Sequence, residues 1–335
     1  MRFRPPSILN FAEGILRALG TPAENAAEIA ESLMRSDMRG YGTHGVGLLP
    51  LYAEMVADGA IDPTAEPIIR DTSGNVISVD GRLAYGQLTG AKATDAGVKM
   101  AKKDGVAVVA IRDGAHLGRL GEWAERASSD GLVFFAFANT GGGAKNVAPF
   151  GGFERKLSTN PIAFGVPTFD AIPFNIIVDF ATSQVSGSVI RDHYRVGERL
   201  NDAWTTTTSG EPVTDAEDFM AGEGAILPLG GLATGHKGYG LAVIAELMGG
   251  FAGGTVVGQA DPKWFSNAAI FVLFDPTKLL AIDDIESRIA AFAKHIRDDN
   301  VRLPGEGSHN RAIDSEAEGA QIPGHVLVSL CKMAK

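Results

Sequence analysis

Short runs of apolar residues, each about the length of one strand, recur along the middle of the chain between segments with helical periodicity. The predicted strands cover residues 75–80, 106–111, 132–137, 162–166, 175–180 and 268–274. Helical patterns cover residues 90–103, 120–128 and 240–251. Interleaved strands and helices are typical of a mixed α and β region. Residues 75–80 alternate like a strand, whereas the nearly unbroken apolar runs at 106–111 and 132–137 indicate buried strands.

Both ends of the chain show helical patterns alone. Ser7 is expected to cap a first helix, and residues 21–24 form a capping box with proline at the first position of a second helix, which runs to about Met38. A third helical pattern covers residues 48–56. We therefore expect a helical domain at residues 1–75, completed by residues 286–335, and a mixed α/β domain at residues 76–285.

Composition limits the kinds of partner and site. The 335 residues suffice for two domains, and the net charge of -10 without a basic run argues against nucleic acid or an anionic membrane as partner. The single cysteine, Cys331, excludes an internal disulfide, and no spacing indicates a metal site. No apolar run reaches the roughly 18 residues of a membrane span, and no signal-peptide pattern is present. The default expectation is a soluble, cytoplasmic protein.

The stretch from Asp37 to Gly47 places four glycines around a single histidine, His44. It also carries a carboxylate and a guanidinium upstream, on Asp37 and Arg39. A histidine on a glycine-rich turn can reach a ligand that a histidine on a helix face could not. We interpret His44 as a proton-transfer residue, and the alternative is a turn whose histidine makes only local hydrogen bonds.

The same stretch matches the G-x-G-x-x-G pattern at Gly40, Gly42 and Gly45. Dinucleotide binding by this pattern requires a strand before it and a helix after it. Here the preceding residues have helical composition and period. We therefore reject a Rossmann fingerprint.

Two further glycine-rich turns follow predicted buried strands, where α/β proteins place ligands. The first carries His116, and Arg119 three residues later suits an anionic substrate. The second, residues 139–145, has three consecutive glycines whose N–H groups could bind phosphate. The alternatives are an ordinary strand-to-helix turn with a solvated Arg119 and a flexible loop.

An aspartate and a helix start complete the candidate groups. Asp179 ends an otherwise apolar strand, where it either caps the following helix or orients a histidine. Residues 235–241 open a helix with glycines and Lys237, which suits an anion at the helix N-terminus. The alternative for this second segment is simply the start of a helix.

Nine short motifs agree, in order, with those of a known enzyme family. They lie at residues 43–45, 85–87, 105–107, 116–118, 148–152, 159–161, 179–183, 237–241 and 303–306. Together they extend over nearly the whole chain. The chain therefore resembles the type-2 malate/L-lactate dehydrogenase family, also called the sulfolactate-dehydrogenase-like family.

The resemblance implies an α+β fold: a non-Rossmann mixed sheet that binds NAD or NADP, flanked by helices, plus a helical domain. It also implies a homodimer, with the active site between domains and near the subunit interface. His44 would be the catalytic acid/base, with Asp179 and His116 as further catalytic residues. The implied cofactor-binding residues are His116, Asn139, Lys145, Thr159, Asn160, Pro161, Asp179, Ala181, Thr182, Lys237, Gly238, Gly305, Glu306 and Arg311.

Two positions depart from the family's pattern. Members that act on small oxo acids usually have serine before the histidine and arginine four residues after it, where this chain has Thr43 and Leu48. Threonine keeps the hydroxyl, but leucine cannot bind a carboxylate. We expect that Thr43, Leu48 and Arg119 line the substrate site and that the Arg119 guanidinium holds the carboxylate. Leu48 would form an apolar wall that favours a larger or aromatic substrate.

The predicted function is reversible, NAD(P)H-dependent reduction of a 2-oxo acid to a 2-hydroxy acid. A histidine near neutral pKa can donate the proton that neutralises the developing alkoxide. Reduction of cyclic 2-imino acids is the nearest alternative, because a proton on an imine nitrogen would replace the alkoxide proton. A catalytically silent ligand-binding or scaffold protein of the same fold is an alternative of another class.

Overall fold

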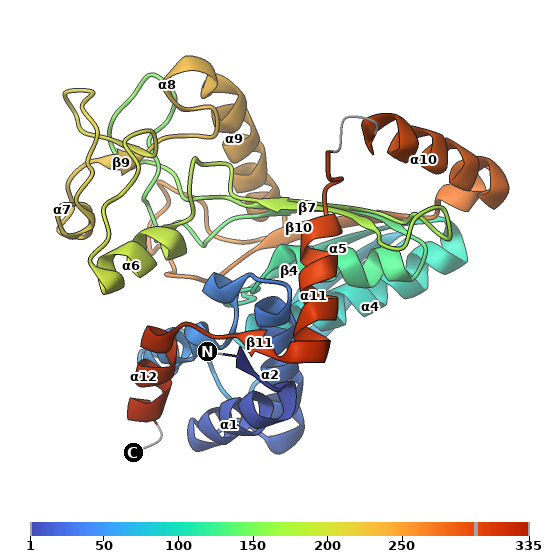
Figure 1. The fold of residues 1–335 in the computed structure, drawn as a ribbon, viewed down its shortest axis with the longest axis horizontal. Helices are drawn as coiled ribbons and strands as arrows, with labels where there is room; N and C mark the ends of the chain where they lie inside the picture. Colours follow the sequence, from blue (N-terminus) through green and yellow to red (C-terminus); the bar gives the residue numbers. More distant parts are fainter. Residues whose placement is uncertain (1, 298–300, 334–335) are drawn as a thin grey trace. The chain divides into compact units, whose positions relative to one another are not determined.

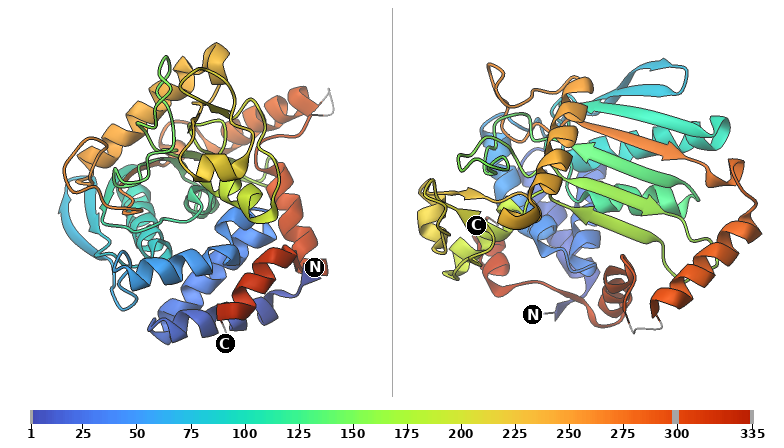
Figure 2. Two further views of the ribbon diagram at one scale, coloured as in Figure 1. Left: turned by 90° about the vertical axis from the view of Figure 1, so that its left-hand side faces the viewer. Right: turned by 90° about the horizontal axis from the view of Figure 1, so that it is seen from above.

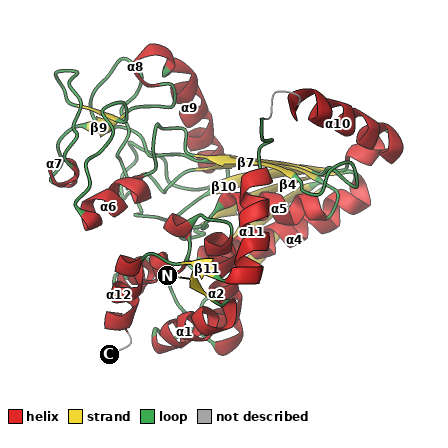
Figure 3. Cartoon of the chain, in the orientation of Figure 1, coloured by secondary structure: helices red, strands yellow, loops and turns green. Residues whose placement is uncertain are grey.

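The computed structural model describes residues 2–297 and 301–333 of the chain (Figure 1). The chain divides into two units by its internal packing. Unit 1 contains Met1–Ala136, Ala163–Asp179 and Phe271–Lys335, and unit 2 contains Phe137–Ile162 and Phe180–Ile270. Helices and strands alternate along much of the sequence (Figure 3), which confirms the predicted mixed α and β class.

A seven-stranded mixed sheet is the main β structure (Figure 2). Its order is β2 (Ile68–Ser73), β3 (Val76–Asp80), β4 (Val106–Arg112), β10 (Ala269–Phe274), β5 (Val133–Ala138), β6 (Ile162–Val166) and β7 (Ile176–Phe180). β2 and β3 are antiparallel, whereas β3 and β4 are parallel. The edge strand β2 is polar and almost wholly exposed, and the sequence did not predict it.

The helices of unit 1 pack around the sheet and around one another. They are α1 (Pro5–Ala18), α2 (Ala23–Met38), α3 (Leu49–Ala57), α4 (Gly86–Asp104), α5 (Leu120–Ser129), α10 (Ile282–Arg297), α11 (Glu306–Glu318) and α12 (Gly324–Met333). Phe134 and Phe271 meet edge to face in the core, with ring centroids 5.0 Å apart. The short strands β1 (Arg2–Phe3) and β11 (Ala320–Gln321) pair, which ties the C-terminal segment to the N-terminal helices.

Unit 2 is richer in loops. Its elements are α6 (Gly187–Val196), β8 (Thr205–Thr206), α7 (Ala216–Met220), β9 (Ala225–Ile226), α8 (Gly231–Thr234) and α9 (His236–Phe251). An apolar cluster that includes Ile190, Phe219 and Ile226 holds these segments together.

Two predicted helix caps are wrong. Helix α1 begins at Pro5, before Ser7, because proline at the first helical positions gives up an N–H that would have no partner there. Helix α2 has no side-chain cap, and the Thr21 hydroxyl donates instead to the Tyr85 hydroxyl at 3.2 Å. Neither helix therefore begins with a side-chain cap, and a proline stands at the start of each, Pro5 in α1 and Pro22 before α2.

The N-terminal helices and the sheet region share unit 1. The buried Glu122 of α5 accepts hydrogen bonds from Ser32 Oγ at 2.6 Å and Arg35 Nε at 2.9 Å, both on α2. The predicted boundaries after residues 75 and 285 therefore do not coincide with this division into units. Among the helices of the described ranges, none combines the length and apolar character needed to cross a membrane.

Candidate active site

The histidine turn consists of two consecutive 3-10 helices between α2 and α3, Gly42–His44 and Val46–Leu48. His44 N donates to the Tyr41 carbonyl at 2.8 Å, and Thr43 Oγ1 lies 3.1 Å from His44 Nδ1. The segment before the turn is helix α2, not a strand, which confirms that the glycine pattern here is no Rossmann fingerprint.

Asp37, at the end of α2, supports this turn. Its carboxylate is buried, with the residue only 5% exposed, and Oδ2 accepts a hydrogen bond from Val46 N at 2.8 Å. A Cβ at Gly45 would overlap the carboxylate, so glycine is needed for the close approach. Burial raises the pKa of Asp37 to about 7, although the Val46 N–H bond lowers it in part.

We expect Gly45→Ala to destabilise the protein by about 1–3 kcal/mol and to reduce turnover, since the new methyl group must displace the Asp37 carboxylate. The matched control is Gly42→Ala, where the nearest neighbouring atom to the added Cβ is Asp37 Oδ1 at 3.8 Å. Thermal unfolding and steady-state assays measure both effects. Equal losses in the two variants would contradict the close-approach explanation.

The raised pKa of Asp37 predicts that stability falls as pH rises. The folded state holds the Asp37 proton up to about pH 7, whereas the unfolded carboxyl loses it near its ordinary pKa of 3.8. This contribution is complete below the unfolded pKa and is lost as pH rises through the folded pKa, by at most about 1.4 kcal/mol per pH unit. Asp37→Asn should therefore be more stable than the parent at about pH 8, by roughly 4 kcal/mol for a pKa raised from 3.8 to about 7.

Denaturant unfolding of both proteins between about pH 4 and pH 8 measures this difference. The parent and Asp37→Asn should have similar stabilities near the acid end and diverge toward the alkaline end. A constant difference across the range would show that Asp37 does not titrate with a raised pKa.

The loop after β4 brings His116 against His44. The two imidazole rings stack with centroids 5.9 Å apart and planes inclined by 17°. Asp113 and Ala115 have φ of 48° and 44°, a left-handed conformation that costs energy for residues with a Cβ. Strain of this kind is common where a fold fixes a functional side chain.

Arg119 has a different environment from the one predicted. Its side chain is 1% exposed, and its NH1 and NH2 groups donate to the two Glu125 carboxylate oxygens at 3.1 and 2.6 Å. Its guanidinium also lies over the Tyr41 ring, 4.9 Å from the centroid. Because the Glu125 carboxylate already accepts hydrogen bonds from both guanidinium NH groups, this finding counts against the expectation that Arg119 holds the substrate carboxylate.

Asp179 caps a helix, but not the one that follows it. Its Oδ2 accepts a hydrogen bond from Gly121 N, in the first turn of α5, at 2.7 Å. Burial raises its pKa, while the Gly121 N–H and the Arg119 charge lower it. Helix α6 is capped by Ser186 instead, so the predicted cap of the following helix is wrong.

Two further predicted site residues, Leu48 and Arg311, have structural contacts at or next to the histidine turn. Leu48 is buried, and its neighbour Gly47 lies close to Val326 of α12. Arg311 Nε donates to the Arg39 carbonyl at 2.9 Å and, with Asp37, lines a hollow of about 510 Å³. Arg311 therefore braces the end of α2.

Gly305 and Glu306 shape the connection from α10 to α11. Gly305 has φ of 90°, and a Cβ there would lie 2.8 Å from the Asn175 carbonyl oxygen. Glu306 accepts hydrogen bonds from Leu303 N at 3.0 Å and from Arg297 at 2.8 Å. Both residues have clear structural roles.

In unit 2, two of the predicted cofactor-binding residues belong to a buried polar network. Asn160 Nδ2 donates to Glu246 Oε2 at 2.8 Å, and Asn139 Nδ2 donates to the Thr255 carbonyl at 3.0 Å. Asn160 also has φ of 34°, which glycine adopts more readily. These amides hold the loops in place through their Nδ2 groups.

The neighbouring predicted residues pair mainly through their backbones. Thr182 N donates to the Thr159 carbonyl at 2.9 Å, and the Pro161 carbonyl accepts from Ala138 N at 3.1 Å. Ala181, next to Thr182, is half-buried. Two buried oxygens, Thr140 Oγ1 and Asn160 Oδ1, have no protein partner among the residues that the structure describes, so each could bond a ligand.

Lys145 and Lys237 are both exposed, so their charges are available to an anion. Gly238 follows Lys237 in α9, where a Cβ would overlap the Leu229 backbone. The glycine run at 141–143 also lies close against other backbone, and Gly141 N bonds to Asn139 Oδ1 at 3.3 Å. This glycine loop is therefore packed rather than open.

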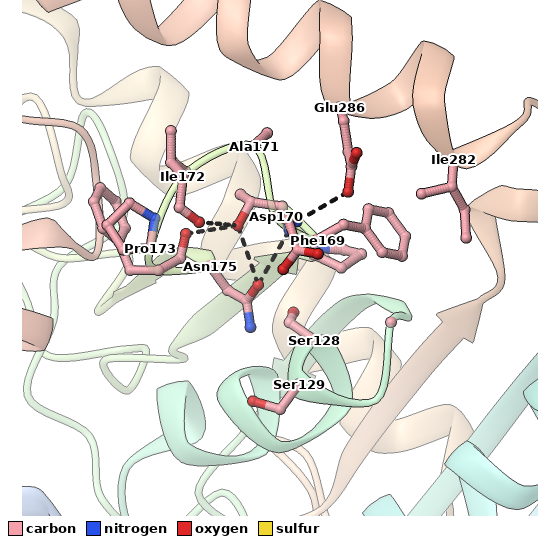
Figure 4. Close-up of a pocket in the computed structure, with 14 residues that line it drawn as sticks. Ser128, Ser129, Phe169, Asp170, Ala171, Ile172, Pro173, Asn175, Ile282 and Glu286 are labelled. Carbon is pink, nitrogen blue, oxygen red and sulfur yellow. Dashed lines mark hydrogen bonds between the residues drawn. The ribbon is translucent and has the colours of Figure 1, made fainter.

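A separate hollow of about 820 Å³ lies between α5, the loop from β6 to β7, and α10 (Figure 4). Asp170 and Glu286 contribute carboxylates to it, and Glu286 accepts the Asp170 N–H at 3.0 Å. Among its described lining residues there is no lysine, arginine or histidine. It therefore suits an anion poorly, and the paired histidines remain the candidate catalytic groups.

Sequence reasoning missed the groups that hold His116. Tyr52 Oη lies 3.1 Å from His116 Nδ1, and Gln87 Nε2 donates to Tyr52 Oη at 2.7 Å. Gln87 lies in one of the nine motifs, which was the available signal, whereas Tyr52 lies in none. No three histidine, cysteine or carboxylate groups form a possible metal site within residues 2–297 and 301–333.

The chain matches a known protein family along nearly its whole length. The family model described as malate/L-lactate dehydrogenase matches residues 3–331. The chain belongs to this family. L-lactate dehydrogenase of Cupriavidus necator is 33% identical over 329 residues, covering 94% of this chain and 93% of that protein.

Two solved structures are similar to this chain and share its fold. A putative malate/lactate dehydrogenase from E. coli matches with a TM-score of 0.91 and 26% identity, covering 100% of this chain and 94% of that one. The delta1-piperideine-2-carboxylate reductase from Pseudomonas syringae matches with a TM-score of 0.86 and 27% identity, covering 99% of each chain.

The residues present fit the nicotinamide cofactor that a dehydrogenase family implies. A dinucleotide offers phosphates, hydroxyls and an amide, so it needs cations and hydrogen-bonding groups. Unit 2 supplies the exposed Lys145 and Lys237, together with the buried Thr140 and Asn160 oxygens, for which the described part of the chain holds no partner.

Proposed function

We propose that this chain catalyses the reversible, NAD(P)H-dependent reduction of a 2-oxo acid to a 2-hydroxy acid. The observation that carries the proposal is the stacked pair His44 and His116 on two glycine-rich loops, the second of which holds Asp113 and Ala115 at positive φ. Family membership and the L-lactate dehydrogenase relative support this class of reaction.

His44 is the acid/base in this proposal. Reduction of a C2 carbonyl develops negative charge on oxygen, and the imidazolium of His44 donates the proton that forms the hydroxyl group. In the reverse direction, neutral His44 removes the hydroxyl proton. Thr43 Oγ1, 3.1 Å from Nδ1, orients the ring so that Nε2 takes part in the transfer.

The cofactor, NAD or NADP, supplies the hydride when bound. We assign its contacts in unit 2 to Lys145, Lys237, Thr159, Asn160, Pro161, Ala181 and Thr182, with backbone contacts from Asn139 and Gly238. In unit 1, we retain His116, Asp179, Gly305, Glu306 and Arg311 as candidates. The cation charges at Lys145 and Lys237 support phosphate binding in particular.

The substrate carboxylate needs a donor other than Arg119, whose fork is occupied by Glu125. Arg119 instead contacts Tyr41 and so positions the histidine turn. We retain Thr43 and Leu48 as residues that face the substrate side of the turn. The neutral donors of unit 1 include the ring N–H of His116.

A second candidate function is reduction of a cyclic 2-imino acid. The observation in its favour is the close structural match to a delta1-piperideine-2-carboxylate reductase. His44 would then donate its proton to the imine nitrogen. Mixing pure protein with NADH or NADPH and a panel of 2-oxo acids and cyclic imines, while following cofactor absorbance, separates the two functions. Absence of turnover with both classes would contradict each proposal and favour a silent ligand-binding protein.

We also propose a homodimer that works in the cytoplasm. In unit 2, α9 exposes apolar side chains along one side, at Ile244, Leu247 and Phe251, and Leu232 of α8 is exposed as well. The opposite side of α9 is buried through Ala242 and Ala245. Contiguous exposed apolar surface is typical of a protein interface. Sedimentation of the parent and of Phe251→Glu tests this, and a monomeric parent would contradict it.

A further inference from the structure

The partners of His116 form a short chain of hydrogen bonds through three elements of unit 1. Gln87, in the first turn of α4, donates from Nε2 to Tyr52 Oη at 2.7 Å. Tyr52, on α3, lies 3.1 Å from His116 Nδ1 through the same oxygen. His116 itself follows β4. Each of the three side chains therefore comes from a separate segment that the fold brings together.

Burial keeps water away from the two supporting residues. Tyr52 is 0% exposed and Gln87 is 1% exposed. The Tyr85 ring meets the Tyr52 ring edge to face, with centroids 5.8 Å apart. Water cannot replace these bonds, so breaking either one would leave a further buried polar atom unpaired, in addition to Gln87 Oε1, which has no partner among the described residues.

Close backbone packing fixes the positions of the donor and of the histidine. A Cβ at Gly86 would overlap the His116 carbonyl, and one at Gly118 would lie 3.1 Å from Gln87 Nε2. The start of α4 can therefore approach the His116 loop only because both positions are glycine. This explains why Gln87 reaches Tyr52 and why His116 faces the phenol.

The direction of the bonds determines where the imidazole carries its hydrogen. An amide nitrogen can only donate, so Gln87 Nε2 uses a lone pair of the Tyr52 oxygen. The phenol hydrogen then points toward His116 Nδ1. Burial raises the pKa of Tyr52, so the phenol keeps this hydrogen. A ring nitrogen that accepts carries no hydrogen, which leaves the hydrogen of the neutral ring on Nε2.

We propose that Tyr52, oriented by Gln87, is a positioning residue that fixes His116 as the Nε2–H tautomer. His116 then serves as a neutral N–H donor to a carboxylate or carbonyl oxygen of the substrate. This role rests on the proposed function and deepens it. It separates the two stacked histidines, since His44 transfers the proton while His116 binds an oxygen. The Nε2–H of His116 is also a hydrogen-bond donor for the substrate, which Leu48 cannot be and which Arg119, paired with Glu125, does not provide.

The direct test is nitrogen NMR of protein labelled with ¹⁵N-histidine, with His116 assigned by the signal lost in His116→Gln. The parent should show an unprotonated Nδ1 and a protonated Nε2 at His116. Tyr52→Phe should shift this residue to a mixture of tautomers. The matched control is Tyr85→Phe, which removes the hydroxyl bonded to Thr21 and should leave the His116 tautomer unchanged.

An Nδ1-protonated His116 in the parent would overturn the inference, and so would an unchanged His116 signal in Tyr52→Phe. If Tyr52 had only a packing role, Tyr52→Phe would lower the melting temperature without moving the tautomer. Where Tyr52→Phe does not fold, Gln87→Met provides a second variant, and it should also give a tautomer mixture.

Kinetics supply the link to the substrate. Tyr52→Phe should raise KM for a 2-oxo acid by roughly three- to tenfold and change kcat less, as expected for one hydrogen-bonded contact. The NMR result does not depend on turnover. An inactive parent with the Nε2–H tautomer would overturn the proposed function alone, whereas an active parent with the Nδ1–H tautomer would overturn this inference alone.

Discussion

Replacement of His44 by alanine should lower kcat by roughly 10²–10⁴-fold, the usual contribution of a general acid, while the protein stays folded. The half-buried ring is held by the hydrogen-bonded turn and stacks on His116, so its removal takes away the proton donor and leaves the turn's backbone bonds intact. Steady-state rates of cofactor oxidation and a melting curve measure the two parts of this expectation.

The control for His44→Ala is His295→Ala, which removes an exposed histidine on α10 and should leave kcat unchanged. Solvent can replace an imidazole there, but not at the reacting oxygen. Turnover of His44→Ala within a few-fold of the parent would contradict the assignment, and His116 would then become the candidate acid/base.

Arg119→Ala should destabilise the protein by about 3–5 kcal/mol, because it removes one partner of a buried ion pair. Among the described residues, Glu125 would keep the ion pair with Arg39, whose Nε lies 2.9 Å from Glu125 Oε2. The Asp179 carboxyl would lose a nearby positive charge as well. We expect reduced kcat through displacement of Tyr41, with KM for the oxo acid changed by less than about threefold.

Chemical unfolding and steady-state kinetics test this expectation. The control is an exposed ion pair of α5, the helix that begins directly after Arg119. Arg126→Ala breaks the exposed pair of Arg126 with Asp95 and should cost at most about 1 kcal/mol. If Arg119→Ala instead raised KM strongly with little loss of stability, the guanidinium would contact the substrate directly, as the sequence predicted.

The strands were predictable because a short, nearly unbroken apolar run is typical of a strand buried on both faces. The structure places β6 at Ile162–Val166, the predicted range, whereas the polar edge strand β2 has no such run. Helices α4 and α9 begin four residues before their predicted starts, at Gly86 and His236. Gly86 and Gly238 weaken the helical signal, yet tertiary packing requires glycine at both positions.

The candidate site was predictable in part. Glycine-rich turns after helical and strand patterns led to His44 and His116, and the structure stacks their rings. The pairing of Arg119 with Glu125 was not predictable, because it depends on how α5 starts and on the burial of both side chains. The partners of His116 were not predictable either, because the contact depends on tertiary packing: Tyr52 lies on a helix 64 residues away in sequence.

The most direct test of the proposed reaction is transfer of deuterium from reduced nicotinamide cofactor that carries deuterium at both C4 positions, so that transfer from either face delivers the label. Pure protein is incubated with this cofactor and the best oxo acid of the panel, and the product is analysed by mass spectrometry. The proposal predicts a 2-hydroxy acid with one deuterium at C2, formed by the parent and nearly absent with His44→Ala. A product without deuterium at C2, or no hydroxy acid from the parent, would contradict it.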